Sequence, residues 1–411
     1  MRILCQKLFE ILRSIKDCFF TVKLILALSA IQAVLAMVFY LPSMPAIVKE
    51  FNINHITAQY AISLFIIGQA IIPLFLGYLG DRFNLRKVMA GTMLLFSLSC
   101  FLMLIFPTAY GLLVCRFLQG GFSQAGITLS RAMIKGSSTY HQTVKILSWL
   151  AVLQSFVHII GPFLGGWVIE HTHWWNNFYI LGGIGIILFF VSIRVPDKLQ
   201  SLNCSLNNIS ASYIRQIFLC PYFLGYSFIV STLHFCTIFF FSMSPFYFIT
   251  FCKISPENFG VYLGITSVGF IAGSIFLPIY LHKFNHDKIL IISLFSAILV
   301  GLPPLFFLHQ QQNLVELIIL SQFLYAFIKA LISPILQSKA MDLFPKLQAT
   351  GASAFNFIST LTASFGSMCA SFFSIEIAVM TLSLAMIFTS VFDFFLILLL
   401  KPNKQKKILI T

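Results

Sequence analysis

The chain has 411 residues, of which 59% are hydrophobic and 9% are charged, whereas soluble domains carry about 25% charged residues. Its net charge is +14, but the cations are spread over short loops, which excludes a basic nucleic-acid-binding domain. The nine cysteines are never spaced as Cys-x-x-Cys, so they indicate neither a disulfide framework nor a metal site. This composition predicts a polytopic protein of the lipid bilayer, and we expect no cofactor.

Residues 1–22 are basic and carry apolar residues at helical spacing, including Leu4, Leu8 and Leu12. This pattern predicts an amphipathic helix on the cytoplasmic face of the membrane. A cleavable signal peptide is the alternative. Against it, the apolar run that begins at Leu24 is long enough to span a bilayer.

Apolar runs of about 20 residues, the length that crosses a bilayer, recur along the chain. We predict twelve spans, at residues 24–46, 57–79, 88–106, 110–134, 145–169, 177–194, 219–250, 258–281, 288–308, 314–338, 348–372 and 376–400. The long polar segment 195–218 divides them into two six-helix halves. The sequence therefore predicts an all-α membrane protein with the following segments: an N-terminal half (23–194), a cytoplasmic linker (195–218), a C-terminal half (219–400) and a basic cytoplasmic tail (401–411).

The lysines and arginines are distributed unevenly between alternate loops. Of the 26, 22 fall in the segments that lie inside if the N-terminus is inside. Lys49 and Lys253 fall in outer loops, and Arg116 and Lys329 fall within spans. Loops rich in lysine and arginine stay in the cytoplasm, so both termini are predicted to be cytoplasmic.

A dense charge cluster separates the second and third spans, where residues 77–87 read Gly-Tyr-Leu-Gly-Asp-Arg-Phe-Asn-Leu-Arg-Lys. Asp81, Arg82 and Arg86 must lie at a water interface, because charges in hydrocarbon cost several kcal/mol. The stretch resembles the loop between helices 2 and 3 of the major facilitator superfamily. Asn84 replaces that family's usual glycine, and we expect it to tolerate left-handed backbone angles there.

Two further stretches resemble the same family. Arg116-Phe117-Leu118-Gln119-Gly120 is similar to its helix 4 signature. Gly161-Pro162-Phe163-Leu164-Gly165-Gly166 is similar to the helix 5 pattern associated with antiporters. A proline removes one backbone hydrogen bond and glycines allow close helix contact, so this segment can bend or pack tightly. The resemblance implies two pseudo-symmetric halves that rock around a site near the midplane.

The resemblance also implies a conformational latch at the inner face. Asp81 would pair with Arg131 and with the positive N-terminal end of helix 11, near Thr350. We assign the latch to Gly77, Asp81, Arg82, Arg86 and Arg131.

The subfamily is suggested by the first half of the chain. Tyr40-Leu41-Pro42-Ser43-Met44-Pro45 and Leu129-Ser130-Arg131-Ala132-Met133-Ile134 resemble the bicyclomycin-resistance (Bcr/CflA) drug-efflux group. That group commonly carries an acidic residue two positions before the Tyr-Leu-Pro, where this chain has Val38. Whether protons are coupled through helix 1 is therefore an open question.

Polar residues within the spans are candidates for substrate binding or coupling. Arg116 and Lys329 would make the cavity positive and favour anionic substrates. Histidine is the side chain whose ordinary pKa lies near neutral pH, so His158 and His234 are candidates to replace the missing carboxylate. Each of these residues has packing as its alternative role, and for Asp393 we expect a structural pairing. The full candidate set is Arg116, Lys329, Gln32, Gln119, Gln154, His158, His234 and Tyr40.

Arg116 has no acidic partner within spans one to four. We expect it to contact helix 1 or 5 through Gln32, Gln154 or backbone carbonyls. The chain has no Gly-x-x-x-x-Gly-Lys-Ser/Thr loop, so ATP is not its energy source.

The resemblance implies a secondary transporter of the inner membrane and not an enzyme. We expect a monomer that exports drugs or metabolites by alternating access in exchange for protons. The first alternative is uptake or export of an organic anion, such as a siderophore or a carboxylate metabolite. A non-transporting sensor that kept the fold is the second alternative.

Overall fold

The computed structural model of the chain describes residues 24–25, 27–137, 140–194, 216–280, 286–306, 314–344 and 348–400. This part of the chain is built from helices and contains no strand. The predicted N-terminal amphipathic segment (1–22), residues 195–215 of the predicted linker and the predicted tail (401–411) lie outside the described residues.

The first predicted span is a pair of helices, Ala27–Val38 and α2 (Tyr40–Phe51), with a bend of 42° between them. Pro42 explains the break, because it lacks the N–H that would bond to the Val38 carbonyl one turn earlier. The remaining helices of the first half are α3 (His55–Arg82), α4 (Leu85–Ile105), α5 (Ala109–Ser137), α6 (Tyr140–His171) and α7 (Trp175–Ile193).

The second half repeats this arrangement after the linker. Its elements are α9 (Pro221–Pro245) with a π-helical turn η2 (Phe246–Phe251), α10 (Pro256–Tyr280), α11 (His286–Phe306), α12 (Leu314–Asp342), α13 (Gln348–Ser371), the short turn η5 (Ile375–Ile377) and α14 (Ala378–Leu399). Each predicted span coincides with one of these helices or with the bent pair, and the ends differ by at most five residues.

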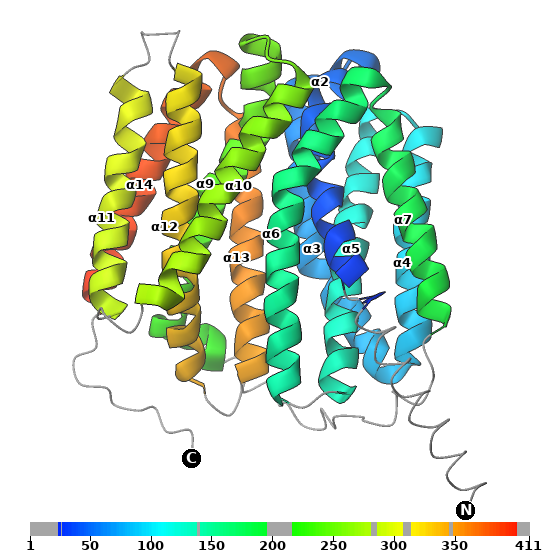
Figure 1. The fold of residues 1–411 in the computed structure, drawn as a ribbon, viewed down its shortest axis with the longest axis horizontal. Coiled ribbons are helices and arrows are strands. Elements are labelled where there is room, and N and C mark those ends of the chain that lie inside the picture. Colours follow the sequence, from blue (N-terminus) through cyan, green and yellow to red (C-terminus); the bar gives the residue numbers. More distant parts are fainter. Residues whose placement is uncertain are drawn as a thin grey trace, which may run out of the picture.

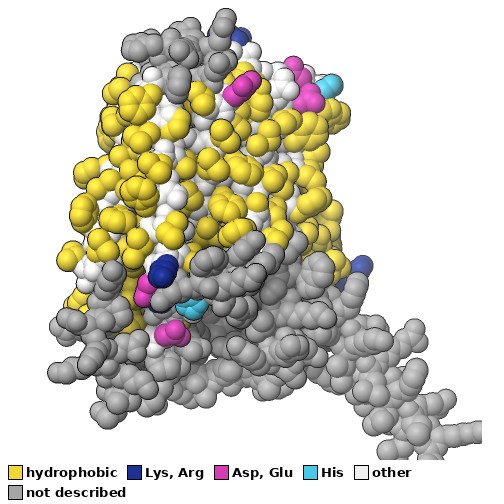
Figure 2. All heavy atoms as spheres, turned by 60° about the vertical axis from the view of Figure 1, so that its left-hand side comes forward, with side chains coloured by type: hydrophobic (Ala, Val, Ile, Leu, Met, Phe, Trp, Pro, Cys, Tyr) yellow, Lys and Arg dark blue, Asp and Glu magenta, His cyan; other side chains and the backbone are white. Residues whose placement is uncertain are grey.

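The helices form a bundle whose sides are apolar. Among the described residues, eight helices are long and apolar enough to cross a membrane, or nine when the bent pair counts as one span. Figure 1 shows α5, α6 and α13, which are outside that set, running through the bundle beside them. In Figure 2, hydrophobic side chains cover the visible wall while charged ones gather toward its two ends. The chain is thus a multi-pass membrane protein with the predicted all-α fold.

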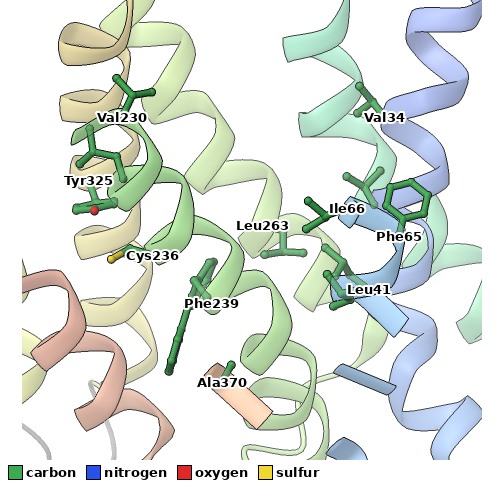
Figure 3. Packing of buried hydrophobic residues seen from close by; sticks show 14 of the residues in the cluster. Val34, Leu41, Phe65, Ile66, Val230, Cys236, Phe239, Leu263, Tyr325 and Ala370 are labelled. Carbon is green, nitrogen blue, oxygen red and sulfur yellow. The ribbon is translucent and has the colours of Figure 1, made fainter. Parts of the chain in front are cut away.

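Large exposed hydrophobic side chains make up this wall. Phe75, Ile292 and Phe388 are 66%, 64% and 74% exposed. In water such exposure would be unfavourable, whereas lipid tails are as apolar as these side chains. The interior is packed by a cluster that draws residues from both halves, including Leu41, Phe65, Phe239 and Leu263 in Figure 3.

Asn84 does not adopt the left-handed backbone angles that we expect it to tolerate. Its φ of −62° and ψ of 112° place it in the extended region and not in the left-handed one. Its side-chain oxygen instead accepts a hydrogen bond of 3.0 Å from the Arg86 backbone N–H, which caps α4. A glycine could not cap the helix in this way, so the substitution gives α4 a defined start.

The two halves meet along two helix pairs. α3 packs against α13, and α6 packs against α10. In Figure 1, α10 crosses α6 near the top of the view and leans away from it lower down. Both pairs join one helix of each half, so they position any site that lies between the halves.

Candidate functional site

Arg116 lies wholly inside the first half, with 0% exposure. One terminal nitrogen, Nη1, donates to the Ala36 carbonyl at 2.8 Å and to Gln119 Oε1 at 3.1 Å. The guanidinium carbon Cζ also lies 4.3 Å from the Tyr40 ring centre and 4.1 Å from that of Phe65. Arg116 thereby joins the bent first span to α3 and α5 through a backbone carbonyl and two aromatic faces.

One glycine of the helix 4 signature and one glycine of α3 bring these elements together. Gly120 lies against the backbone of Phe65, and Gly68 lies against the backbone of Phe117, so any side chain at either position would collide with the facing helix. α3 and α5 therefore cross at close range, which places the Phe65 ring on Arg116.

The buried side-chain amides of Gln119 and Gln32 differ in their hydrogen bonding. Gln119 accepts from Arg116 and donates to the Ser99 carbonyl at 3.2 Å. Gln32 is also 0% exposed, but neither of its amide atoms has a hydrogen-bond partner among the described residues. The Nε and Nη2 atoms of Arg116 likewise have no hydrogen-bond partner among the described residues. In this conformation Gln32 and Gln154 make no hydrogen bond to Arg116 in the described part of the chain.

The second half contributes a cation at the middle of α12. Lys329 is half-buried, and its Nζ donates to Thr237 Oγ1 on α9 at 3.0 Å. His158 of α6 and His234 of α9 both lie close enough to Lys329 for electrostatic interaction. The structure thus places basic side chains of α6 and α9 within electrostatic reach of Lys329 on α12, near where the two halves meet.

His158 lies at a contact between the halves. Its ring Nδ1 is 2.8 Å from the Gln154 carbonyl, and its own carbonyl accepts from Ser267 Oγ of α10 at 3.4 Å. Arg116 and Tyr40 stay apart from this group, because both are sealed within the first half, where the Tyr40 hydroxyl donates to the Ala58 carbonyl at 3.0 Å. In this conformation Lys329 and the two histidines, all half-buried, are the basic candidates near the contact between the halves.

The helix 5 pattern has contacts on two sides. Gly161 lies against Val38 and Gly165 against Phe39, both of the first span. Gly166 lies against the backbone of Pro256 at the start of α10, in the other half. In return Gly260 of α10 lies against the backbone of Pro162. The pattern thus holds the first span and the second half to the same helix.

A polar contact that the sequence analysis did not anticipate joins α3 to the second half. Ser367 Oγ of α13 lies 2.7 Å from the Gln59 carbonyl and 2.9 Å from Ser242 Oγ of α9. Gln59 Nε2 donates to the Ser242 carbonyl at 3.4 Å. We call Gln59, Ser242 and Ser367 the outer clasp, because they lie toward the ends of α3, α9 and α13 that are predicted to be outside.

The predicted latch is described only in part. Asp81 and Arg82 form the C-terminal end of α3, and Arg131 lies in the last two turns of α5. The surroundings of Gly77 and the side chains of Asp81, Arg82 and Arg131 lie outside the described structure, so the latch stays a prediction. In the second half, Lys339 at the end of α12 forms an ion pair with Asp287 at the start of α11.

The sequence matches the family model of the Major Facilitator Superfamily over residues 26–367. It is 23% identical over 266 residues to the chloramphenicol resistance protein CraA of Acinetobacter baumannii, covering 64% of this chain and 62% of that protein. It is also 23% identical over 267 residues to a bicyclomycin resistance protein homolog of Haemophilus influenzae, covering 64% and 67%. These relatives confirm the predicted resemblance to drug-efflux proteins.

The fold has a close counterpart among solved structures. A crystal structure of a D-xylose-proton symporter superposes with a TM-score of 0.73 at 13% identity, covering 91% of this chain and 97% of that one. The family, its small-molecule transporters and the apolar bundle agree that the chain is a transporter and not an enzyme. The chain belongs to the major facilitator superfamily.

Proposed function

We propose that the chain is a secondary transporter of a bacterial inner membrane that exports small molecules in exchange for protons. It would act as a monomer with both termini in the cytoplasm, and its two halves would rock to open the central site to either side. The names of the resistance proteins it resembles support drug efflux. The glycine contacts of α6 with both the first span and α10 support a hinge between the halves.

The observation that carries the proposal is the group formed by Lys329, His158 and His234. It joins both halves at mid-span, and Lys329 has no carboxylate within ion-pair distance among the described residues. A cation at this depth is unfavourable unless it is paired or hydrated. A substrate carboxylate would supply the missing partner, so we propose that this site prefers carboxylate-bearing drugs or metabolites.

The proposed transport cycle also needs contacts that close the central site on the outer side and on the inner side in turn. The outer clasp and the α6–α10 contact support a conformation that is closed on the outside. We assign the opposite closure to the predicted latch, in which Asp81 would pair with Arg131 and the start of α13. An Asp81→Asn variant that transports at the full rate would argue against the latch.

Transport by purified protein in proteoliposomes tests this proposal. The probes are nalidixic acid, which carries a carboxylate, chloramphenicol, which is neutral, and ethidium, which is cationic. With an imposed pH gradient, we expect accumulation that collapses when a protonophore is added, with nalidixic acid preferred. Accumulation that ignores the pH gradient would contradict proton antiport.

Variants at Lys329 test the assigned site. Lys329→Met should remove the preference for nalidixic acid, whereas Lys329→Arg should keep it because the positive charge remains. Lys288→Met is the matched control, since Lys288 is an exposed lysine near the start of α11. Equal preference in Lys329→Met and the unmodified protein would contradict the site.

A further inference from the structure

Asp393 is a carboxyl group buried in the second half, and no hydrogen bond or ion pair within the described structure joins it to Lys329. Asp393 is 0% exposed and lies on the side of α14 that faces the interior of the bundle, where α14 packs against α9 and α11. Among the described residues its hydrogen-bond partner is Thr232 of α9, and its Oδ1 atom has none. The structural pairing expected for Asp393 is therefore a hydroxyl contact and not an ion pair.

The contacts of Thr232 bear on the protonation of Asp393. Thr232 Oγ1 lies 2.7 Å from the Ile229 carbonyl and 2.6 Å from Asp393 Oδ2. A hydroxyl has one hydrogen to donate, and a backbone carbonyl can only accept. An ionised Asp393 would have to share the single Thr232 hydrogen with the Ile229 carbonyl, whereas a protonated Asp393 can donate to Thr232 while Thr232 donates to Ile229. The two short contacts therefore favour a protonated Asp393.

The same arrangement recurs nearby with a different donor. Thr237 Oγ1 lies 2.9 Å from the Leu233 carbonyl and accepts from Lys329 Nζ. There the Lys329 ammonium donates to Thr237 Oγ1, while the hydroxyl hydrogen of Thr237 goes to the Leu233 carbonyl. An ionised Asp393 would also leave Oδ1 charged and without a hydrogen-bond donor in the interior, which is unfavourable.

The groups that surround Asp393 leave its charge uncompensated. α9 presents the Cys236 thiol, which lies 3.4 Å from Thr389 Oγ1, and α12 presents the Tyr325 hydroxyl. Figure 3 shows Cys236 and Tyr325 side by side. The charged residues that α11 carries lie at its start, where Asp287 pairs with Lys339. Within the described structure no cation forms an ion pair with Asp393, so its protonation depends on access to water.

We propose that Asp393 is a proton-binding site of the transport cycle and that it is occupied in this conformation. When α9 and α14 rearrange, water reaches the carboxyl, the O–H bond breaks, and a proton leaves to the cytoplasm while a carboxylate remains. A proton from the outer side restores the carboxyl in the opposite conformation. This inference rests on the proposed proton antiport, and it supplies the carboxyl group that helix 1 lacks at Val38.

Two transport modes separate proton coupling from substrate handling. Purified Asp393→Asn in proteoliposomes is assayed with chloramphenicol, first for accumulation driven by a pH gradient and then for exchange of labelled for unlabelled drug at equal pH. We expect loss of the driven accumulation with exchange retained, because the amide keeps the shape but releases no proton. Asp393→Glu should recover driven accumulation.

The outcomes distinguish this inference from the proposed function. Driven accumulation in Asp393→Asn equal to that of the unmodified protein would overturn the Asp393 site and leave antiport standing. An unmodified protein that ignores the pH gradient would overturn antiport itself, and the role of Asp393 in the cycle with it.

Infrared spectroscopy tests the protonation state without transport. At neutral pH we expect the purified protein to show the carbonyl stretch of a buried carboxylic acid, and Asp393→Asn to lack it. Thr232→Val keeps the carboxyl but removes its acceptor, so this stretch should shift in that variant even if Asp393→Asn does not fold. The absence of the stretch in the unmodified protein, or an unchanged stretch in Thr232→Val, would overturn the inference.

Discussion

Arg116 stabilises the first half through the planar shape of its guanidinium group as well as through its charge. Its planar group lies against the rings of Tyr40 and Phe65 while Nη1 bonds to the Ala36 carbonyl. A lysine can reach a carbonyl, but it has no flat face to stack between rings. We therefore expect Arg116→Lys to lower the free energy of unfolding, and Arg116→Ala to lower it by about 3 kcal/mol, since two hydrogen bonds from a charged donor and two ring contacts are lost.

Thermal unfolding of the purified variants, with transport measured on the same preparations, checks this expectation. Arg194→Ala is the control, because Arg194 is exposed at the end of α7. Unaltered stability and transport in both Arg116 variants would remove any role for this residue. Lost transport with intact stability would instead assign Arg116 to substrate or coupling.

Single residues also show where prediction from sequence stops. The positions of Arg116 and Lys329 within spans could be predicted because a charge stands out in an apolar run. The Thr232–Asp393 contact and the outer clasp could not. A serine or threonine in a spanning helix usually bonds to a carbonyl one turn back, so its presence says nothing about a partner on another helix. Ser367 and Thr232 both reach other helices.

At the scale of elements, hydropathy predicted where the helices begin and end. The contacts between helices depend on glycines, and the sequence does not show which backbone each glycine lies against. Gly260 of α10 has the backbone of Pro162 and Phe163 where a Cβ would lie. Gly260→Ala should therefore push α6 and α10 apart. Overpacking of this kind costs about 1–3 kcal/mol, enough to change the balance between two conformations by about 5- to 150-fold.

Gly183→Ala of α7 is the matched control, because no heavy atom lies within 4 Å of the added carbon. Transport rates in proteoliposomes give the comparison, with thermal unfolding as a check on folding. We expect a clear fall in Gly260→Ala alone. Similar rates in the two variants would mean that the α6–α10 contact does not control the cycle.

At the scale of the molecule, the halves must separate on the outside if the site opens there. The outer clasp offers a direct test, because Ser367 Oγ lies 2.7 Å from the Gln59 carbonyl across the two halves. In a chain whose native cysteines are replaced, Gln59→Cys with Ser367→Cys should form a disulfide on oxidation. Transport should then stop, since the outer ends of α3 and α13 can no longer part, and a reducing agent should restore it.

A second pair of positions in the outer clasp provides the control crosslink. Ser242 and Ser367 lie 2.9 Å apart but both belong to the second half. A disulfide between cysteines at these two positions joins α9 to α13 and leaves the halves free to move relative to each other. Transport should therefore survive this crosslink. If complete oxidation of the Gln59→Cys, Ser367→Cys protein leaves transport unchanged, the outer ends do not separate during the cycle, and rocking of the two halves is not how this chain moves its substrate.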